Sequence, residues 1–134
     1  MKRDSQPEIT DEQMNSRLAQ TREYTLVVLT ATAKTFTADS GPVIWEHGRR
    51  NMALRADSVL SVVRPVTDGS ELVGIGIFDA TDDELRRMMD GDPAVEAGVL
   101  TYEVHPVRGS QATRFRRGMG KLASLPNRWP TNQS

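Results

Sequence analysis

Asp92 is the residue whose position in this chain most directly suggests chemistry. It precedes Pro93, and an aspartate followed by proline is typical of a helix start, with the carboxylate as N-cap and the proline in the first helical position. Gly98 then suits the left-handed residue that ends a short turn of helix. A carboxylate at a helix entrance can cap the backbone, or it can serve as a reactive group. The sequence leaves both roles open for Asp92.

His47 is the second residue suited to chemistry, because an imidazole can accept or release a proton near neutral pH. Ile44, His47, Asn51 and Leu54 recur at the spacing of one helix face, so we expect His47 to face a sheet rather than solvent. A single histidine on such a face is more often a hydrogen-bonded structural residue than a catalyst. The other histidine, His105, falls inside a predicted strand and is expected at an edge or an interface.

Composition excludes several kinds of site. The chain has no cysteine, which excludes disulfides, thiolate catalysis and cysteine-ligated zinc. It has 2 histidines, so a histidine-rich metal site is not expected. Gly74 and Gly76 fall inside an apolar strand pattern rather than in a phosphate-binding loop, and no serine-nucleophile motif is present. We therefore predict neither a metal nor a cofactor.

The elements that would position Asp92 and His47 alternate through the middle of the chain. Apolar, β-branched runs bounded by turn residues predict strands, and helical spacing behind capping residues predicts helices. We expect Arg49 and Arg50 on the solvated side of the first of these helices. The order is β-α-β-β-α-β, the split arrangement of an α+β, ferredoxin-like fold. The predicted strands cover residues 24–32, 58–66, 72–78 and 99–105, the last ending at Pro106, and the predicted helices cover residues 43–56 and 82–89.

This order leaves one face of the sheet without helices. An apolar sheet face left bare is usually buried by association. The sequence therefore predicts a homodimer through the open sheet face, which makes a dimeric α+β barrel.

The two ends of the chain differ from its centre. Residues 1–22 form a polar N-terminal extension, where Thr10 and Gln13 have the spacing of a capping box and predict a short helix with few apolar residues to anchor it. Residues 23–108 form the α+β domain. Residues 109–134 are rich in Arg, Gly, Ser, Asn and Pro and are expected to be partly ordered at best.

Charge is distributed unevenly although the formal net charge is −1. Residues 24–107 hold 7 basic and 13 acidic side chains, whereas residues 108–134 hold 6 basic side chains and no acidic one. Without a recognisable binding motif this basic segment does not predict nucleic-acid binding, and we expect it either to lie over the acidic body of its own or a partner subunit or to stay loose. No apolar run has the length of a membrane span, and the N-terminus lacks a signal-peptide core. The predicted location is the cytoplasm.

The segment from Asp92 to Pro106, DPAVEAGVLTYEVHP, resembles the C-terminal pattern of YciI-like proteins. In that family an Asp-Pro pair, an Ala-Gly-Val and a closing strand with proline recur. His47 stands eighteen residues before Pro65, which is similar to the family's spacing between its histidine and a Gly-Pro pair. Arg64 replaces the glycine of that pair, and it could narrow or charge the cleft. The resemblance covers residues 24–107.

The resemblance implies a site. YciI-like proteins are similar in fold to muconolactone isomerases and carry a histidine–aspartate pair proposed as an active site. Carried over by position, this pair is His47 and Asp92, with the carboxylate accepting Nδ1–H and leaving Nε2 as the base. Asn51 or Arg64 could stabilise a developing oxyanion, and Trp45 could line a pocket, with core packing as its alternative role.

Two functions remain open. The first is a small cofactor-independent lyase or isomerase that uses the His–Asp pair on a cyclic or aromatic-derived small molecule, as some relatives eliminate chloride from chlorinated hydroquinones. The alternative is a non-catalytic small-molecule-binding or accessory protein on the same dimeric scaffold, in which the pair is structural. Geometry separates them first, since the enzyme requires both side chains within hydrogen-bond reach at a cavity.

Overall fold

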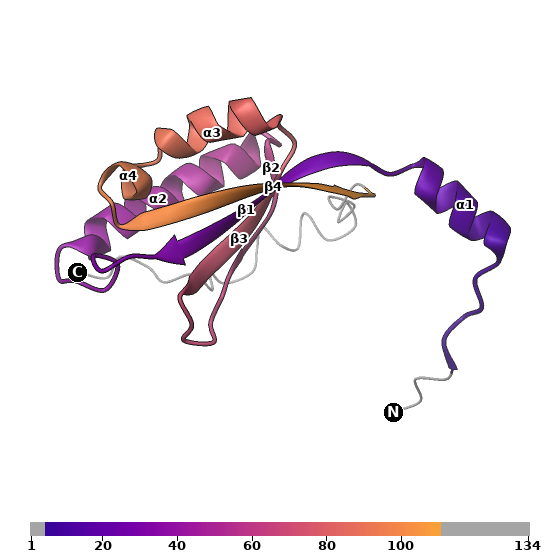
Figure 1. Ribbon diagram of the computed structural model, residues 1–134, viewed down its shortest axis with the longest axis horizontal. Coiled ribbons are helices and arrows are strands. Elements are labelled where there is room, and N and C mark those ends of the chain that lie inside the picture. The colour runs from indigo at the N-terminus through magenta and orange to yellow at the C-terminus, as the bar shows by residue number, and fades with distance from the viewer. Residues whose placement is uncertain (1–4, 111–134) are drawn as a thin grey trace.

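A four-stranded antiparallel sheet forms the centre of the molecule (Figure 1). The computed structural model describes residues 5–110. Strand order is β2-β3-β1-β4, so the two central strands are β1 and β3 and the two edges are β2 and β4. The predicted α+β, ferredoxin-like order is confirmed. The strands are β1 (Arg22–Ala31), β2 (Leu60–Pro65), β3 (Leu72–Phe78) and β4 (Leu100–Gly109), and the helices are α1 (Asp11–Ala19), α2 (Ser40–Ala56), α3 (Asp82–Asp90) and α4 (Pro93–Glu96).

The core lies between the sheet and the helices α2, α3 and α4, which cover one face (Figure 1). Side chains alternate between the two faces along β1. Thr25, Val27 and Leu29 are buried and point to the helix-covered face, while the residues between them are only half-buried. The α3 helix contributes its apolar side, and α4 contributes a buried alanine. The buried apolar residues of this cluster are Val27, Leu29, Leu60, Phe78, Leu85, Met89, Ala94, Val99 and Leu100.

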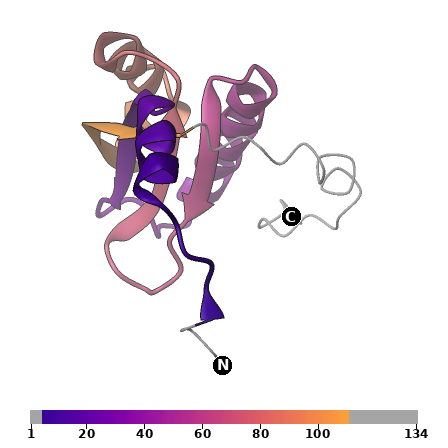
Figure 2. The same cartoon turned by 90° about the vertical axis from the view of Figure 1, so that its right-hand side faces the viewer.

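The opposite face of the sheet carries no helix of the described chain (Figure 2). Register places Leu26 beside Ile77 and Val28 beside Ile75 on this face. All four side chains are half-buried. The open face is therefore apolar at its centre.

The α2 helix begins at Ser40, three residues before the predicted start. Gly41 and Pro42 were expected to lie outside the helix, but both lie in its first turn, where backbone N–H groups need no helical acceptor and proline is tolerated. The Ser40 hydroxyl donates to the Thr35 carbonyl at 2.5 Å, which fixes the entry of the chain. The helix then continues through Gly48 to Ala56 without a break.

Pro106 does not end the last strand, so that prediction is wrong. The β4 strand continues through Pro106, which pairs with Thr25, to Gly109. The reason is its place in the sheet, since an edge strand has N–H groups that face away from any neighbour and tolerates the missing donor of proline.

The N-terminal helix α1 has the predicted capping box. The Thr10 hydroxyl accepts from the Gln13 amide at 3.1 Å, and the Gln13 side chain accepts from the Thr10 amide at 2.9 Å. In Figure 1 this helix projects from one end of the sheet, away from the other three. The predictions for the basic segment fall almost wholly on residues 111–134, which lie outside the described residues. Within residues 5–110, no helix combines the length and the apolar character needed to cross a membrane.

Candidate active site

Asp92 uses its two carboxylate oxygens for two different purposes. One oxygen, Oδ1, accepts the backbone N–H groups of Ala94 at 2.8 Å and Val95 at 3.4 Å, so the predicted N-cap is confirmed. The other, Oδ2, lies 2.8 Å from His47 Nδ1. Pro93 occupies the first turn of α4, and Gly98 follows with φ at 71°, the left-handed stop predicted for it. Capping and pairing with His47 therefore coexist in one side chain.

His47 lies on the side of α2 that packs against the sheet, and its exposed fraction is 9%. Its ring makes two hydrogen bonds, because Nε2 lies 3.3 Å from the Asn51 side-chain nitrogen, one helical turn further along α2. A carboxylate can only accept, so Nδ1 must carry the proton that Asp92 receives. In the neutral imidazole Nε2 then accepts from the Asn51 amide. This is the tautomer that a general base acting through Nε2 requires.

The Asp92 carboxyl is 2% exposed, and its pKa reports the balance between burial and its partners. Burial alone would raise the pKa of this carboxyl. The hydrogen bond and charge of His47, together with the amides of Ala94 and Val95, outweigh burial and hold the pKa below its ordinary value. Asp92 is therefore ionised at neutral pH and available to stabilise an imidazolium.

Two side chains that sequence reasoning did not assign to the site hold the segment carrying Asp92. Arg50 donates to the carbonyls of Met88 at 2.8 Å and Gly91 at 3.0 Å, at the C-terminal end of α3. Tyr102 on β4 donates to the Asp90 carboxylate at 2.7 Å. The prediction that Arg50 is solvated is wrong, whereas Arg49 is exposed and pairs with Glu46. The sequence signal that could have assigned Arg50 to the site is its position three residues after His47, on the same helix.

A small cavity lies beside His47, between α2 and the sheet. Its polar lining is His47 and Asn51, and Asp92 does not line it. The volume is about 10 Å³, close to what one water molecule needs. The apolar lining includes Val27, Leu29, Leu60, Val63, Phe78 and Met89.

Gly76 helps to keep this cavity open. It stands on the helix-covered side of β3, where its neighbours in the sheet are Val27 and Val63. A Cβ at this position would lie 3.0 Å from the Phe78 ring and 3.2 Å from Leu60 Cδ1. The glycine is therefore required by packing at the cavity rather than by phosphate binding.

The other expected site residues lie elsewhere. Arg64 is exposed and pairs with Ile75, which puts it on the open face of the sheet because side chains alternate along a strand. Trp45 is half-buried on α2 and does not line the cavity. His105 is also on the open face, where it pairs with Leu26 and lies 3.8 Å from Glu103. Of the five residues expected at the site, the structure brings together His47, Asp92 and Asn51.

Comparisons with known proteins do not assign this chain to a family. No protein-family model matches the chain, and no curated protein matches it. Among the described residues, no group of three or more His, Cys, Asp or Glu side chains lies close enough together to hold a metal ion.

Proposed function

We propose that this protein is a small cofactor-independent lyase or isomerase in which His47 is the general base and Asp92 orients it. The observation that carries the proposal is the 2.8 Å contact between His47 Nδ1 and Asp92 Oδ2, both buried, with His47 also lining a cavity. An ionised aspartate behind Nδ1 holds the ring in the tautomer whose Nε2 can accept a proton, and it stabilises the cation that results. The substrate class is a cyclic or aromatic-derived small molecule, as the resemblance to YciI-like proteins implies.

The proposed step is a proton transfer. Nε2 takes a proton from a substrate carbon next to a carbonyl, and the electron pair of the broken C–H bond moves toward the carbonyl oxygen as an enolate. Return of the proton to another carbon completes an isomerisation, and departure of a leaving group from the adjacent carbon completes an elimination. The Asn51 amide, at 3.3 Å from Nε2, is placed to donate to the enolate oxygen once substrate displaces it from the imidazole.

Substrate entry requires side chains to move. A cavity of about 10 Å³ does not enclose a ring. Asn51 is half-buried and Met89 is an unbranched side chain, so these two are the groups that can yield. In this proposal the space beside His47 is too small for substrate in the free protein and is widened when substrate binds.

The alternative is a non-catalytic binding or accessory protein, and one observation favours it. Both ring nitrogens of His47 already have partners, as expected of a histidine that only holds α2 to α4. In that case the pair stabilises the fold, and a ligand binds without proton transfer.

Exchange of substrate protons with heavy water distinguishes the two functions. Purified protein is incubated with catechols, hydroquinones and muconolactones in D₂O, and deuterium incorporation is followed by NMR. We expect incorporation that disappears in His47→Ala and falls in Asp92→Asn, while Glu46→Ala, an exposed neighbour on α2, keeps it. Incorporation that survives in His47→Ala would sink the mechanism, and ligand binding without any incorporation supports the alternative.

We also propose that two copies associate through the open sheet face, in keeping with the predicted dimeric α+β barrel. One row across this face runs from Arg64 on β2 through Ile75 and Val28 to Glu103 on β4. A two-fold axis parallel to the strands would set β2 of one copy over β4 of the other, so that Arg64 faces the partner subunit's Glu103. The face thus has an apolar centre and complementary charges at its rims.

A charge reversal tests this arrangement by sedimentation. Arg64→Glu alone and Glu103→Arg alone should each weaken the dimer by placing like charges together. The double variant should recover it. If the double variant is no better than either single one, the proposed pairing is wrong.

A further inference from the structure

The N-terminal helix α1 has an apolar side with nothing packed on it. Ile9, Met14 and Leu18 are 48%, 46% and 58% exposed, and no residue of α1 is buried against the described chain. Met14 and Leu18 are four residues apart, on one face, and Ile9 precedes the N-cap in the position that packs on Met14 as a hydrophobic staple. A nine-residue helix is marginal in water without packing. This side of α1 therefore calls for a covering partner.

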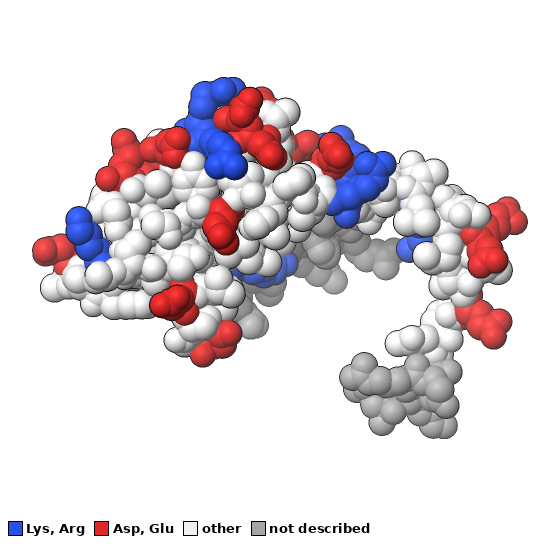
Figure 3. Space-filling model, viewed as in Figure 1, with Lys and Arg blue, Asp and Glu red and all other residues white. Residues whose placement is uncertain are grey.

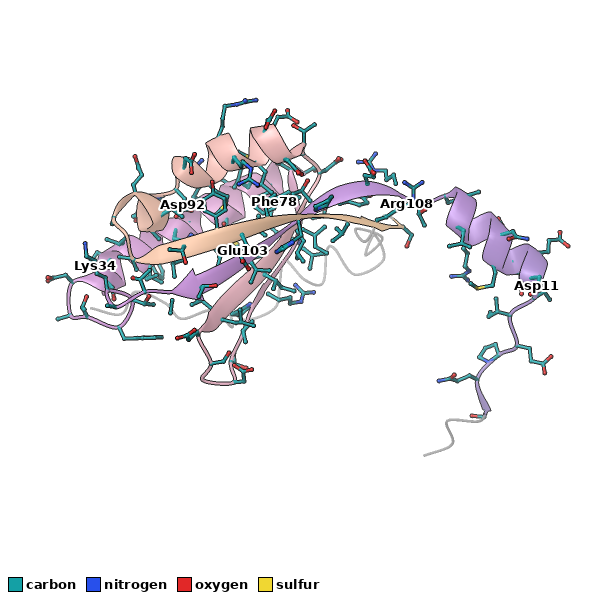
Figure 4. The ribbon with its side chains drawn as sticks, viewed as in Figure 1. Asp11, Lys34, Phe78, Asp92, Glu103 and Arg108 are labelled. Carbon is teal, nitrogen blue, oxygen red and sulfur yellow. The ribbon has the colours of Figure 1, made fainter. Side chains whose placement is uncertain are left out.

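The helix is also joined firmly to the sheet. Arg108 on β4 donates through Nε to the Thr21 hydroxyl at 3.0 Å and through its terminal nitrogen to the Thr21 carbonyl at 3.3 Å. Arg22 pairs with Asp79 at the start of β1. Figure 4 shows Arg108 between the sheet and α1, with Asp11 at the far end of the helix. The C-terminal end of α1 thus has a fixed position beside β4.

The described chain ends at this same place. Gly109 pairs with Arg22, so Ser110 leaves the sheet directly beside the end of α1. Residues 111–134 follow from that point. The α1 helix is only about 14 Å long at 1.5 Å per residue, so a few residues of this segment are enough to reach its far end.

The segment of residues 111–134 contains apolar and basic side chains that could pack on α1. Phe115, Met119 and Leu122 recur at i, i+4 and i+7, the spacing of one helix face. Its charged residues are Arg114, Arg116, Arg117, Lys121 and Arg128, with no acidic residue among them. The opposite end of α1 is acidic, through Glu8, Asp11 and Glu12 (Figure 3).

We infer that residues 111–134 cover α1 of the same chain, with Phe115, Met119 and Leu122 on its apolar side and the basic residues toward its acidic start. The short connection through Ser110 favours the same chain over a second copy, because it gives the segment a high effective concentration at α1. This inference is independent of the proposed activity. It means that the N-terminal and C-terminal extensions bind each other, through the apolar side of α1.

Hydrogen exchange of the full-length protein tests the inference. We expect the α1 amides to exchange at least about tenfold more slowly than an unstructured peptide. In Met119→Asp/Leu122→Asp they should exchange at the unprotected rate. The matched control Ser124→Asp/Asn127→Asp introduces the same charges at polar positions of the segment and should leave most of the protection.

Each other outcome contradicts the inference. Unprotected α1 amides in the unchanged protein would mean that nothing covers the helix. Protection that persists in Met119→Asp/Leu122→Asp would mean that a different surface covers it. Protection that falls on dilution would assign the covering segment to a second copy.

Discussion

The two faces of the sheet are built from neighbouring residues of the same strands, yet they differ in what surrounds them. Val27 is 1% exposed beneath the helices, while Val28, the next residue, is half-buried on the open face. The covered face also holds the buried carboxylate and the buried imidazole of the described residues, Asp92 and His47. The proposed chemistry and the proposed association therefore lie on opposite sides of one layer, only a strand's thickness apart.

Removing the Asp92 carboxylate from the covered face should have the largest effect. Asp92→Ala removes the α4 cap and leaves the Nδ1–H of His47 buried without an acceptor, so we expect a loss of about 2–4 kcal/mol in the free energy of unfolding. Urea denaturation measures it. Asp90→Ala, which loses only the bond from Tyr102, should cost about 1 kcal/mol. Equal losses in the two variants would contradict the dual role of Asp92.

Shortening one valine on each face sharpens the comparison. Val27→Ala leaves a cavity in the core and should cost about 2 kcal/mol at any protein concentration. Val28→Ala should cost less than about 1 kcal/mol in dilute solution and more as concentration rises, because the proposed association would cover the part of this side chain that is exposed in the single chain. Unfolding monitored at two concentrations separates them. A concentration-independent cost at Val28 would argue against association through this face.

Acid should weaken the covered face selectively. The folded-state pKa of Asp92 is below its ordinary value, so its ionised form adds stability that is fully present above about pH 4 and is lost as pH falls through the folded-state pKa. The difference in unfolding free energy between the unchanged protein and Asp92→Asn should therefore narrow below about pH 4. A difference in unfolding free energy that stays constant down to pH 2 would mean that the charge of Asp92 is not the source of the added stability.

The smallest expected change in stability comes from removing a helix cap, and the chain has two similar caps to compare. Thr10 and Thr81 both close capping boxes, but α3 contributes Leu85 and Met89 to the core whereas α1 contributes nothing to it. Thr81→Ala should lower the free energy of unfolding by about 1 kcal/mol. Thr10→Ala should leave it nearly unchanged and alter only hydrogen exchange in α1.

Local signals predicted most of the fold. Capping residues, Gly98 and the apolar runs identified the elements because each rests on neighbouring residues alone. The start of α2 and the end of β4 were misplaced because Pro42 and Pro106 depend on context, one in a first helical turn and the other on a sheet edge. The resemblance and the helix-face spacing together predicted the meeting of His47 and Asp92. Arg50 was missed since its acceptors are carbonyls brought close only by tertiary packing.

The position of Arg64 shows the limit of reasoning from spacing. Its place before Pro65 suggested the cleft, but the face on which a strand residue points depends on register, and one residue of shift reverses it. An irregularity between Leu60 and Val62 sets the register of β2. No short-range sequence signal identified that irregularity.

Proline also stands in both edge strands, Pro65 at the end of β2 and Pro106 inside β4. An edge strand normally offers a row of unpaired donors to which a stray strand can add, and a proline interrupts that row. Neither border of this sheet is therefore a good template for runaway strand addition. The apolar open face of the sheet thus lies between two edges that both disfavour the addition of a further strand.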